Sequence, residues 1–462
     1  MSAVNTNQII VSYRGIASAL ENVDLAGAIE AGTSHRNEAG EDTVVGRSPD
    51  DPLAGSPPPP TLPPPPTDEL PQLDDLQRMA MIRQLERAVG EIAVADKTPG
   101  VFFVPDSQAA SLLLAYMARA GLERGKLEEV KDGRYEVKFD DHDIKGWVGS
   151  FFQDWIGKVL HKHPFVGAAP IAEKLGNTAR VALLGDWGTG LYGAPVCARA
   201  IVARKPAFDT VIHLGDIYYA GNEDEVKARF LDHWPMIPGA RNRAVNANHE
   251  MYSGGQGYFK KVLPAFQQAS SIFALQNDHY LLVGLDTGYD EHDLAGNQAG
   301  WLQALADQAG DRRIVLMSHH QPFSVFEDQG TKLVKKLRSL LAGRRIFAWY
   351  WGHEHRCMIY EKHQEWQMYG RLVGHSGYPY FRKDFSAYPI RQVNRDKTTW
   401  RALKETDVAP ASAILEGPNP YVTDAPQKYG PQGWASLELD GPRLLERIHA
   451  ADGTVLHEKE LT

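Results

Sequence analysis

The stretch between residues 180 and 216 decides the fold class of this chain. It opens with RVALLGDWG at residues 180–188 and closes with TVIHLGD at residues 210–216, and a helical pattern separates the two runs. Each run is short and mainly apolar until it reaches a glycine followed by an aspartate. Short apolar runs of this kind are typical of strands buried on both faces and covered by helices. The stretch therefore predicts a layered α/β domain.

The same pattern recurs before the chain ends in a different one. HYLLVGLDT (279–287), RRIVLMSHH (312–320) and RIFAWYWGHEH (345–355) are further predicted strands, and helical stretches follow the first two. Residues 434–461 instead show three alternating segments joined by turns, which predicts an antiparallel meander. In layered α/β domains the loops at the C-terminal ends of the strands bind ligands. We therefore expect the functional residues at those strand ends.

The N-terminal part has a different composition. Residues 1–74 are predicted to be a largely disordered, proline-rich linker, because SPPPPTLPPPP favours extended polyproline II over a packed fold. This tract serves either as a tether, the favoured interpretation, or as a docking ligand for a protein partner. Residues 75–165 are predicted to form a small helical or α/β accessory module, in which the aromatic stripe 147–155 packs against a neighbour. Residues 175–462 form the main predicted domain.

Composition limits the possible partners and compartments. The 462 residues carry a formal net charge of -9, which gives no electrostatic support for binding nucleic acid or an anionic membrane. Two cysteines exclude a disulfide framework and suit a reducing compartment. The N-terminus does not show the pattern of a secretory signal, and no segment approaches the ~20 apolar residues of a membrane helix. We expect a cytoplasmic protein.

Five clusters in the main domain offer metal-ligand chemistry, and four of them lie at predicted strand ends. Singly, each cluster is an ordinary turn or cap, but together they gather carboxylate, imidazole and carboxamide groups and no thiolate. Divalent metals that are hard or borderline prefer this mixture of oxygen and nitrogen. The clusters are Asp186-Trp187-Gly188, Gly215-Asp216, Asn248-His249-Glu250 (placed in a turn), Ser318-His319-His320 and Gly352-His353-Glu354-His355.

The order of these motifs, D-x-G, GD-x-x-Y, NHE, strand-His and GH-x-H, resembles the calcineurin-like metallophosphoesterase superfamily. Within it the pattern is most similar to the purple acid phosphatase branch, which has a glycine at the position of Gly188 and a tyrosine at the position of Tyr219. The resemblance covers residues 180 to the C-terminus. It implies a four-layer β-sandwich flanked by helices, and an enzyme that cleaves phosphoester bonds of a small phosphorylated substrate.

The resemblance also implies the ligand sets. The first metal would be bound by Asp186, Asp216, Tyr219 and His355, and the second by Asp216, Asn248, His319 and His353. Asp216 would bridge two metal ions, iron with zinc, manganese or a second iron, which activate a hydroxide for attack on phosphorus. His249 is the predicted catalytic residue that orients the phosphoryl group and assists the leaving oxygen.

Several alternatives stay open at this stage. Either His319 or His320 is the ligand after the fourth strand; we favour His319 and predict that His320 lines the pocket. We predict that Tyr218 points away from the metals. The further histidine that purple acid phosphatases carry near the leaving group has no counterpart in residues 325–330. The alternative functions are a nuclease or cyclic-nucleotide phosphodiesterase of the same superfamily, and a non-catalytic, metal-stabilised interaction protein.

Three other polar residues receive structural interpretations. His213 is predicted to be a core histidine, because it lies inside an apolar run. Asp286 is predicted to tie a loop to the backbone near the site. His375 follows the last motif and is a weaker prediction for a residue that approaches the substrate.

Overall fold

The computed structural model describes most of the chain from residue 169 onward. The described residues are 9–10, 83–84, 87–88, 107–115, 126–130, 134–138, 162–166, 169–290, 292–393, 398–422 and 426–462. The proline-rich tract and the aromatic stripe 147–155 lie outside them. Within the predicted accessory module, residues 108–115 are helical and Arg134–Lys138 form the strand β3. β3 lies between β1 (Ile9–Ile10) and β2 (Lys126–Val130) in a three-stranded sheet.

A six-stranded sheet contains the two strands that decide the fold class. Its order is β19-β18-β17-β5-β6-β7, in which β5, β6 and β7 are parallel and the last three strands of the chain form the predicted antiparallel meander. The strands are β5 (Thr178–Leu184), β6 (Thr210–His213), β7 (Arg241–Ala244), β17 (Gly433–Asp440), β18 (Arg443–Ala450) and β19 (Val455–Leu461).

A ten-stranded sheet contains the other predicted strands. Its order is β14-β15-β16-β12-β13-β11-β10-β9-β8-β4, and β9, β10, β11 and β13 are parallel neighbours. The strands are β4 (Glu173–Lys174), β8 (Phe273–Gln276), β9 (Tyr280–Gly284), β10 (Arg313–Ser318), β11 (Ile346–Trp351), β12 (Cys357–Tyr360), β13 (Tyr369–Val373), β14 (Ile390–Val393), β15 (Thr399–Leu403) and β16 (Ser412–Glu416).

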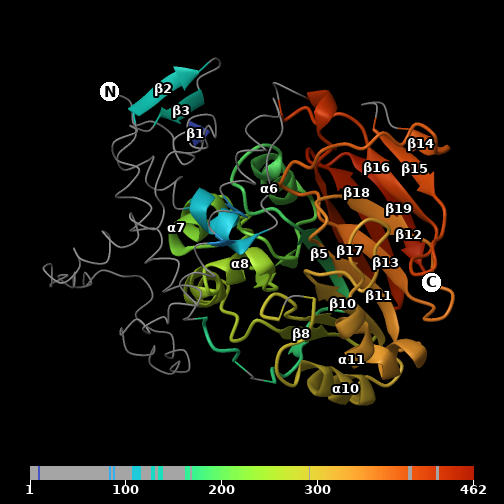
Figure 1. Ribbon diagram of the computed structural model, residues 1–462. Helices are drawn as coiled ribbons and strands as arrows, with labels where there is room; N and C mark the ends of the chain where they lie inside the picture. Colours follow the sequence, from blue (N-terminus) through green and yellow to red (C-terminus); the bar gives the residue numbers. More distant parts are fainter. Residues whose placement is uncertain are drawn as a thin grey trace, which may run out of the picture.

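Helices cover the outer faces of the two sheets. α11 buries Leu333, Leu337, Leu340 and Leu341, a spacing that places them on one helix face. α10 and α11 lie side by side next to β10 and β11 (Figure 1). The helices are α6 (Ala194–Ala203), α7 (Glu223–Glu225), α8 (Asn248–Tyr252), α9 (Leu263–Ala265), α10 (Gln298–Gln308) and α11 (Thr331–Ala342), with π-helical segments at Val226–Leu231 and Tyr258–Val262 and a 3-10 turn at Pro426–Lys428.

Three apolar clusters define the layers. The central cluster joins the two sheets, because it contains Val181 of β5 and Val315 of β10. A second cluster packs the ten-stranded sheet against α10 and α11, and a third packs the six-stranded sheet against α6. The layers are therefore helix, sheet, sheet and helix, and the predicted mixed α/β sandwich with flanking helices is confirmed.

One buried ion pair also joins the two sheets. Arg371 of β13 donates from Nε to both carboxylate oxygens of Glu446 of β18, at 2.8 and 2.9 Å, and both side chains are fully buried. The hydroxyl of Tyr350 donates to the same carboxylate at 2.6 Å. Because the charges are paired and hydrogen-bonded, they are tolerated inside an otherwise apolar interface.

The third motif lies in structure that the sequence pattern did not reveal. Asn248-His249-Glu250 was predicted to lie in a turn, but these residues begin helix α8, directly after the missed strand β7. Among the described residues, no helix is both long enough and apolar enough to cross a membrane.

Candidate metal centre

The parallel strands bring four of the five predicted clusters to one edge of the sandwich. Asp186 follows β5, Asp216 follows β6, His319 follows β10, and His353 and His355 follow β11. The fifth cluster lies in the first turn of α8. The backbone N–H of His249 donates to Oδ1 of Asp216 at 3.4 Å, and this hydrogen bond connects the turn to the other clusters. The prediction that these strand ends meet therefore agrees with the structure.

The backbone at the strand ends is strained. Asp186, Asp216, His353 and His355 have φ values of 55°, 77°, 74° and 54°, in the left-handed region that residues other than glycine rarely adopt. Each such residue costs roughly 1–3 kcal/mol and persists only where the surrounding structure enforces it. Four of the seven predicted ligands thus share an unfavourable conformation that turns their side chains toward a common point, which is typical of a functional site.

The first group of ligand atoms comprises Asp186, Asp216 and His355. One oxygen or nitrogen atom from each lies within 4.8 Å of the others. Nε2 of His355 is 3.3 Å from Oδ1 of Asp186, and the other oxygen of Asp186 accepts from the backbone N–H of His353 at 2.9 Å. The hydroxyl of Tyr218 completes the group, at 3.1 Å from Oδ1 of Asp186, 2.9 Å from Oδ2 of Asp216 and 2.8 Å from Nε2 of His355.

The prediction that Tyr218 points away from this group is wrong. It assumed a helical step after Asp216, which would bring the third following residue to the same side. The backbone of Ile217 instead forms a parallel bridge with Gly188, and the Tyr218 N–H donates to the Gly188 carbonyl at 3.0 Å. The two neighbours of a bridging residue lie on the same side of the chain, so Tyr218 faces the metal group with Asp216.

Tyr219, the predicted ligand, has two contacts outside the first group. Its ring lies under the guanidinium of Arg229, at 5.1 Å from the ring centroid, and its backbone N–H donates to Glu225. The structure therefore favours Tyr218 over Tyr219 as the phenol beside Asp186 and Asp216.

Gly188 matters for this arrangement. A Cβ at this position would lie 2.7 Å from the carbonyl oxygen of Asp216 and 2.7 Å from Cα of Ile217. Any side chain at residue 188 would therefore push the two strand ends apart.

The second group of ligand atoms surrounds His319. Its Nε2 lies 3.3 Å from Oδ1 of Asp216 and 3.2 Å from Nδ1 of His353. Its Nδ1 lies 2.9 Å from the carbonyl oxygen of Leu214, which must accept, so Nδ1 carries the hydrogen and Nε2 presents a lone pair. Oδ1 of the buried Asn248 has no hydrogen-bond partner among the described residues, while its Nδ2 donates to Tyr252 at 3.0 Å.

The electrostatics of the centre favour cations. Burial opposes ionisation of Asp216, but the imidazoles around it, His319 first, hold the pKa of its carboxyl below the ordinary range. Burial, together with the charge of Asp216, raises the pKa of Asp186. Burial also lowers the pKa of His319 and His353, and that of His355 to about 3. The imidazoles are therefore neutral at pH 7, which is the form that binds metal.

His249 and Glu250 hold the second aspartate and its surroundings. Nδ1 of His249 lies 2.5 Å from the Tyr219 carbonyl oxygen, so it carries a hydrogen, and Nε2 lies 3.9 Å from Oδ2 of Asp216. The buried carboxylate of Glu250 accepts from the backbone N–H groups of Asp216 (3.1 Å) and Ile217 (3.3 Å). Glu250 had no predicted role, yet it fixes the strained turn that carries Asp216.

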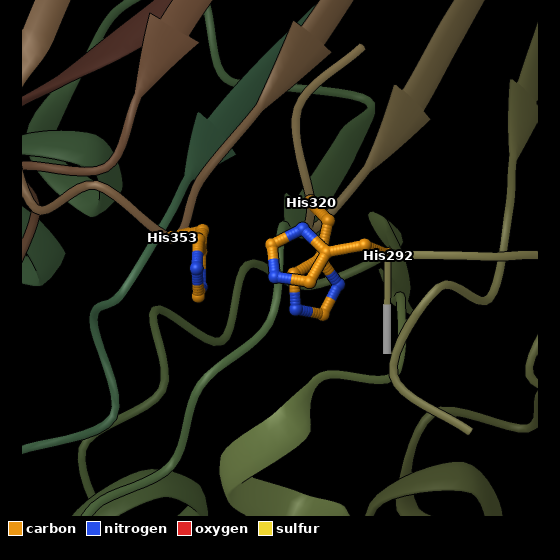
Figure 2. Close-up of side chains that lie close together, drawn as sticks. All are labelled: His292, His320 and His353. Atoms are coloured by element: carbon orange, nitrogen blue, oxygen red, sulfur yellow. The ribbon is translucent and has the colours of Figure 1, made fainter. Parts of the chain in front are cut away.

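His320 lies beside the second group with a histidine that the sequence did not single out. Nδ1 of His320 lies 3.0 Å from Oγ1 of Thr287, and its ring packs against His292 and His353 (Figure 2). That His320 lines the substrate pocket stays a prediction. The only signal for His292 in the sequence is its place in the loop that follows a predicted strand.

The remaining sequence predictions have separate outcomes. His213 is buried against Phe230 and Trp234, as predicted for a core histidine. Asp286 accepts from the backbone N–H of Gly288 at 3.1 Å, and so ties the loop as predicted. His375 is fully buried, and burial lowers its pKa to about 3; its approach to a substrate stays a prediction.

The residues present fit a pair of metal ions. Donor atoms of Asp186, Asp216 and His355 lie within 4.8 Å of one another, and Asp216 also lies 3.3 Å from Nε2 of His319. The buried carboxamide oxygen of Asn248 lacks a hydrogen-bond partner among the described residues, and none of these donors is a thiolate. This donor set suits hard or borderline divalent cations.

Comparison with known protein families finds a match to part of the chain. Residues 179–357 match the model of a family described as calcineurin-like phosphoesterase. A comparison with curated protein sequences finds no significant match.

Several solved structures resemble the described fold at low identity. A purple acid phosphatase from yellow lupin (Lupinus luteus) shares 13% identity at a TM-score of 0.44, over 63% of this chain and 55% of that one. GAP50 of Plasmodium shares 14% identity at a TM-score of 0.43, over 62% of this chain and 89% of that one. Vacuolar protein sorting 29 from Cryptosporidium parvum shares 13% identity at a TM-score of 0.31, over 62% of this chain and 98% of that one. The match thus spans little more than half of the lupin enzyme, and such similarity says nothing of substrate.

Proposed function

We propose that the chain is a calcineurin-like phosphoesterase, the family whose model residues 179–357 match, and that it hydrolyses phosphoester bonds at a centre of two metal ions. The observation that carries the proposal is the position of Asp216. One of its oxygens lies 2.9 Å from the hydroxyl of Tyr218 in the first group, and the other lies 3.3 Å from Nε2 of His319 in the second. A carboxylate between two donor groups is the arrangement that bridges two cations.

The donor groups assign the residues of each position. Asp186, Asp216, His355 and Tyr218 would hold the first cation, and Asp216, Asn248, His319 and His353 the second. Bound there, the cations supply an activated water at neutral pH and neutralise charge on phosphate oxygens. Iron, with zinc, manganese or a second iron, is the pair that we propose, since a phenol is a good ligand for ferric iron.

The chain's own residues prepare this chemistry. Glu250 and the Leu214 carbonyl orient Asp216 and His319 before any cation binds, so little reorganisation accompanies binding. His249 is oriented by the Tyr219 carbonyl through Nδ1, which leaves Nε2 facing the Asp216 side of the centre. A protonated Nε2 there would donate to a phosphoryl or leaving-group oxygen.

The proposed substrate is a small phosphorylated molecule. The net charge of -9 opposes the approach of long polyanions, so attraction must come from the cations at the centre. A phosphomonoesterase and a phosphodiesterase are both compatible with the donor groups, and a nuclease or cyclic-nucleotide phosphodiesterase is the alternative within the same chemistry.

The test measures metal content and turnover on the same samples. Purified full-length protein is assayed on a phosphomonoester, a phosphodiester, a cyclic nucleotide and single-stranded DNA, beside Asp216→Ala. Asp232→Ala is the matched control, because Asp232 forms only an exposed ion pair with Lys227. We expect two metals and turnover in the wild type and the control, and loss of both in Asp216→Ala. Two bound metals without turnover on any substrate would instead favour the non-catalytic, metal-stabilised interpretation.

A further inference from the structure

Three histidines from three separate strand ends meet beside the centre described above. His292 lies in the loop after β9, His320 follows β10, and His353 follows β11. Their ring centroids are 4.1 Å apart for His292 and His320, 4.6 Å for His320 and His353, and 5.1 Å for His292 and His353. Figure 2 shows the rings of His292 and His320 together, opposite that of His353.

Two ring nitrogen atoms of this cluster make no hydrogen bond within the described part of the protein. Nε2 of His320 and Nδ1 of His292 are buried and have no hydrogen-bond partner among the described residues. One nitrogen from each of the three histidines lies within 4.8 Å of the other two. Buried polar atoms without partners are costly, and several that converge on one point indicate a ligand.

The backbone and the charges around His292 agree with a ligand role. His292 has a φ of 58°, so this loop residue is held in an unfavourable conformation like four of the proposed metal ligands. Beyond the histidines, the charged groups that act on it are the carboxylate of Asp328 and the ammonium of Lys332, which oppose each other.

We propose that His292, His320 and His353 form a third cation position, selective for a borderline divalent ion such as Zn²⁺. Three imidazoles with one open coordination position are a known ligand set for zinc, whereas magnesium and calcium prefer oxygen. The inference rests on the geometry of these histidines and does not require that the neighbouring centre hydrolyse phosphoesters.

The new position shares His353 with the second cation position of the proposed centre. A neutral imidazole has one free lone pair, so one cation at a time binds His353 unless the ring loses its second proton. The two positions therefore compete for this residue, and His292 and His320 are the ligands that distinguish the new one.

The experiment counts zinc ions and the imidazoles around them. Metal-free full-length protein is titrated with Zn²⁺ alone by calorimetry and equilibrium dialysis, for the wild type, His292→Ala and His279→Ala. His279 is the control, because it lies in the turn before β9, where its described hydrogen bonds are made by its backbone N–H and carbonyl groups. We expect the zinc affinity of one class of sites to fall at least about tenfold in His292→Ala, because loss of a hydrogen-bond partner of a metal ligand already lowers metal affinity by that much. The zinc affinities of His279→Ala should not change.

A second variant distinguishes zinc bound at the three histidines from zinc bound at the neighbouring second cation position. His319→Ala removes an imidazole that only the mixed oxygen and nitrogen position uses, so it should retain the three-histidine zinc class, and His319→Ala/His292→Ala should lose it. X-ray absorption at the zinc edge should then report more imidazoles per zinc ion in His319→Ala than in His319→Ala/His292→Ala. If His292→Ala is unfolded by circular dichroism, His292→Gln replaces it. Equal zinc affinities and numbers in the wild type and a folded His292 variant would overturn the proposal, whatever the outcome of the phosphoester assays.

Discussion

Replacing Tyr218 by phenylalanine tests the corrected first ligand group. The hydroxyl of Tyr218 lies 3.1 Å from Asp186, 2.9 Å from Asp216 and 2.8 Å from His355, so it touches every other member of that group. Phenylalanine keeps the ring, which packs against His249 with 4.7 Å between the centroids, and removes only these polar contacts. The perturbation is therefore chemical, and the fold should be preserved.

The expected loss follows from the strength of the contacts. A hydrogen bond to a charged group contributes about 1.5–3 kcal/mol, which corresponds to a fall in metal affinity of about ten- to 150-fold. Competition dialysis with Mn²⁺ measures this fall directly. Tyr219→Phe is the matched control and should change the affinity less than about threefold, which is under 1 kcal/mol.

Colour provides a second measurement. If ferric iron fills the first position, the phenolate beside it should give a visible absorption band, which should disappear in Tyr218→Phe and persist in Tyr219→Phe at equal iron content. The opposite result, with the band and the metal affinity depending on Tyr219 alone, would refute the placement of Tyr218 and restore the prediction made from the sequence.

Two further predictions concern stability. Glu446→Leu should lower the free energy of unfolding by about 3–5 kcal/mol, because it leaves the buried charge of Arg371 without its partner; in urea unfolding, the double variant Arg371→Met/Glu446→Leu should recover most of that loss, and equal losses in the two variants would contradict this. Burial lowers the pKa of His449 to about 4 from an unfolded value of 6.5, so the unfolded state binds the proton first and stability falls as pH drops below 6.5. Between pH 7 and pH 5 the wild type should lose about 2 kcal/mol more than His449→Gln, and parallel pH profiles for the two proteins would show that His449 contributes nothing to this loss.

The strand ends were predictable because their signal is local. Each apolar run ends at the first polar residue, so Asp186, Asp216 and His319 mark both the end of a buried strand and the start of the site. His319, the residue directly after the strand, has its Nε2 3.3 Å from Oδ1 of Asp216, and its preference over His320 as the metal ligand stays a prediction. The meander at the C-terminus followed equally from its alternating pattern.

What the sequence did not reveal depends on contacts between distant segments. The orientation of Tyr218 is set by the bridge to Gly188, which lies in another strand end, and the local spacing alone suggested a helical turn. The role of His292 depends on three loops meeting, and nothing in its neighbourhood in the sequence distinguishes it from a surface residue. Strand β7 contains two arginines and an asparagine in four residues, so no apolar run in the sequence predicts a strand there.

The most direct test of the central claim is an anomalous-difference map from crystals of the full-length protein grown with Mn²⁺ or Zn²⁺ and measured at the edge of that metal. Our account predicts two peaks about 3.5–4 Å apart on either side of the Asp216 carboxylate, the first beside Asp186 and His355 and the second beside His319 and Asn248. A single peak, or two peaks that Asp216 does not touch, would contradict it.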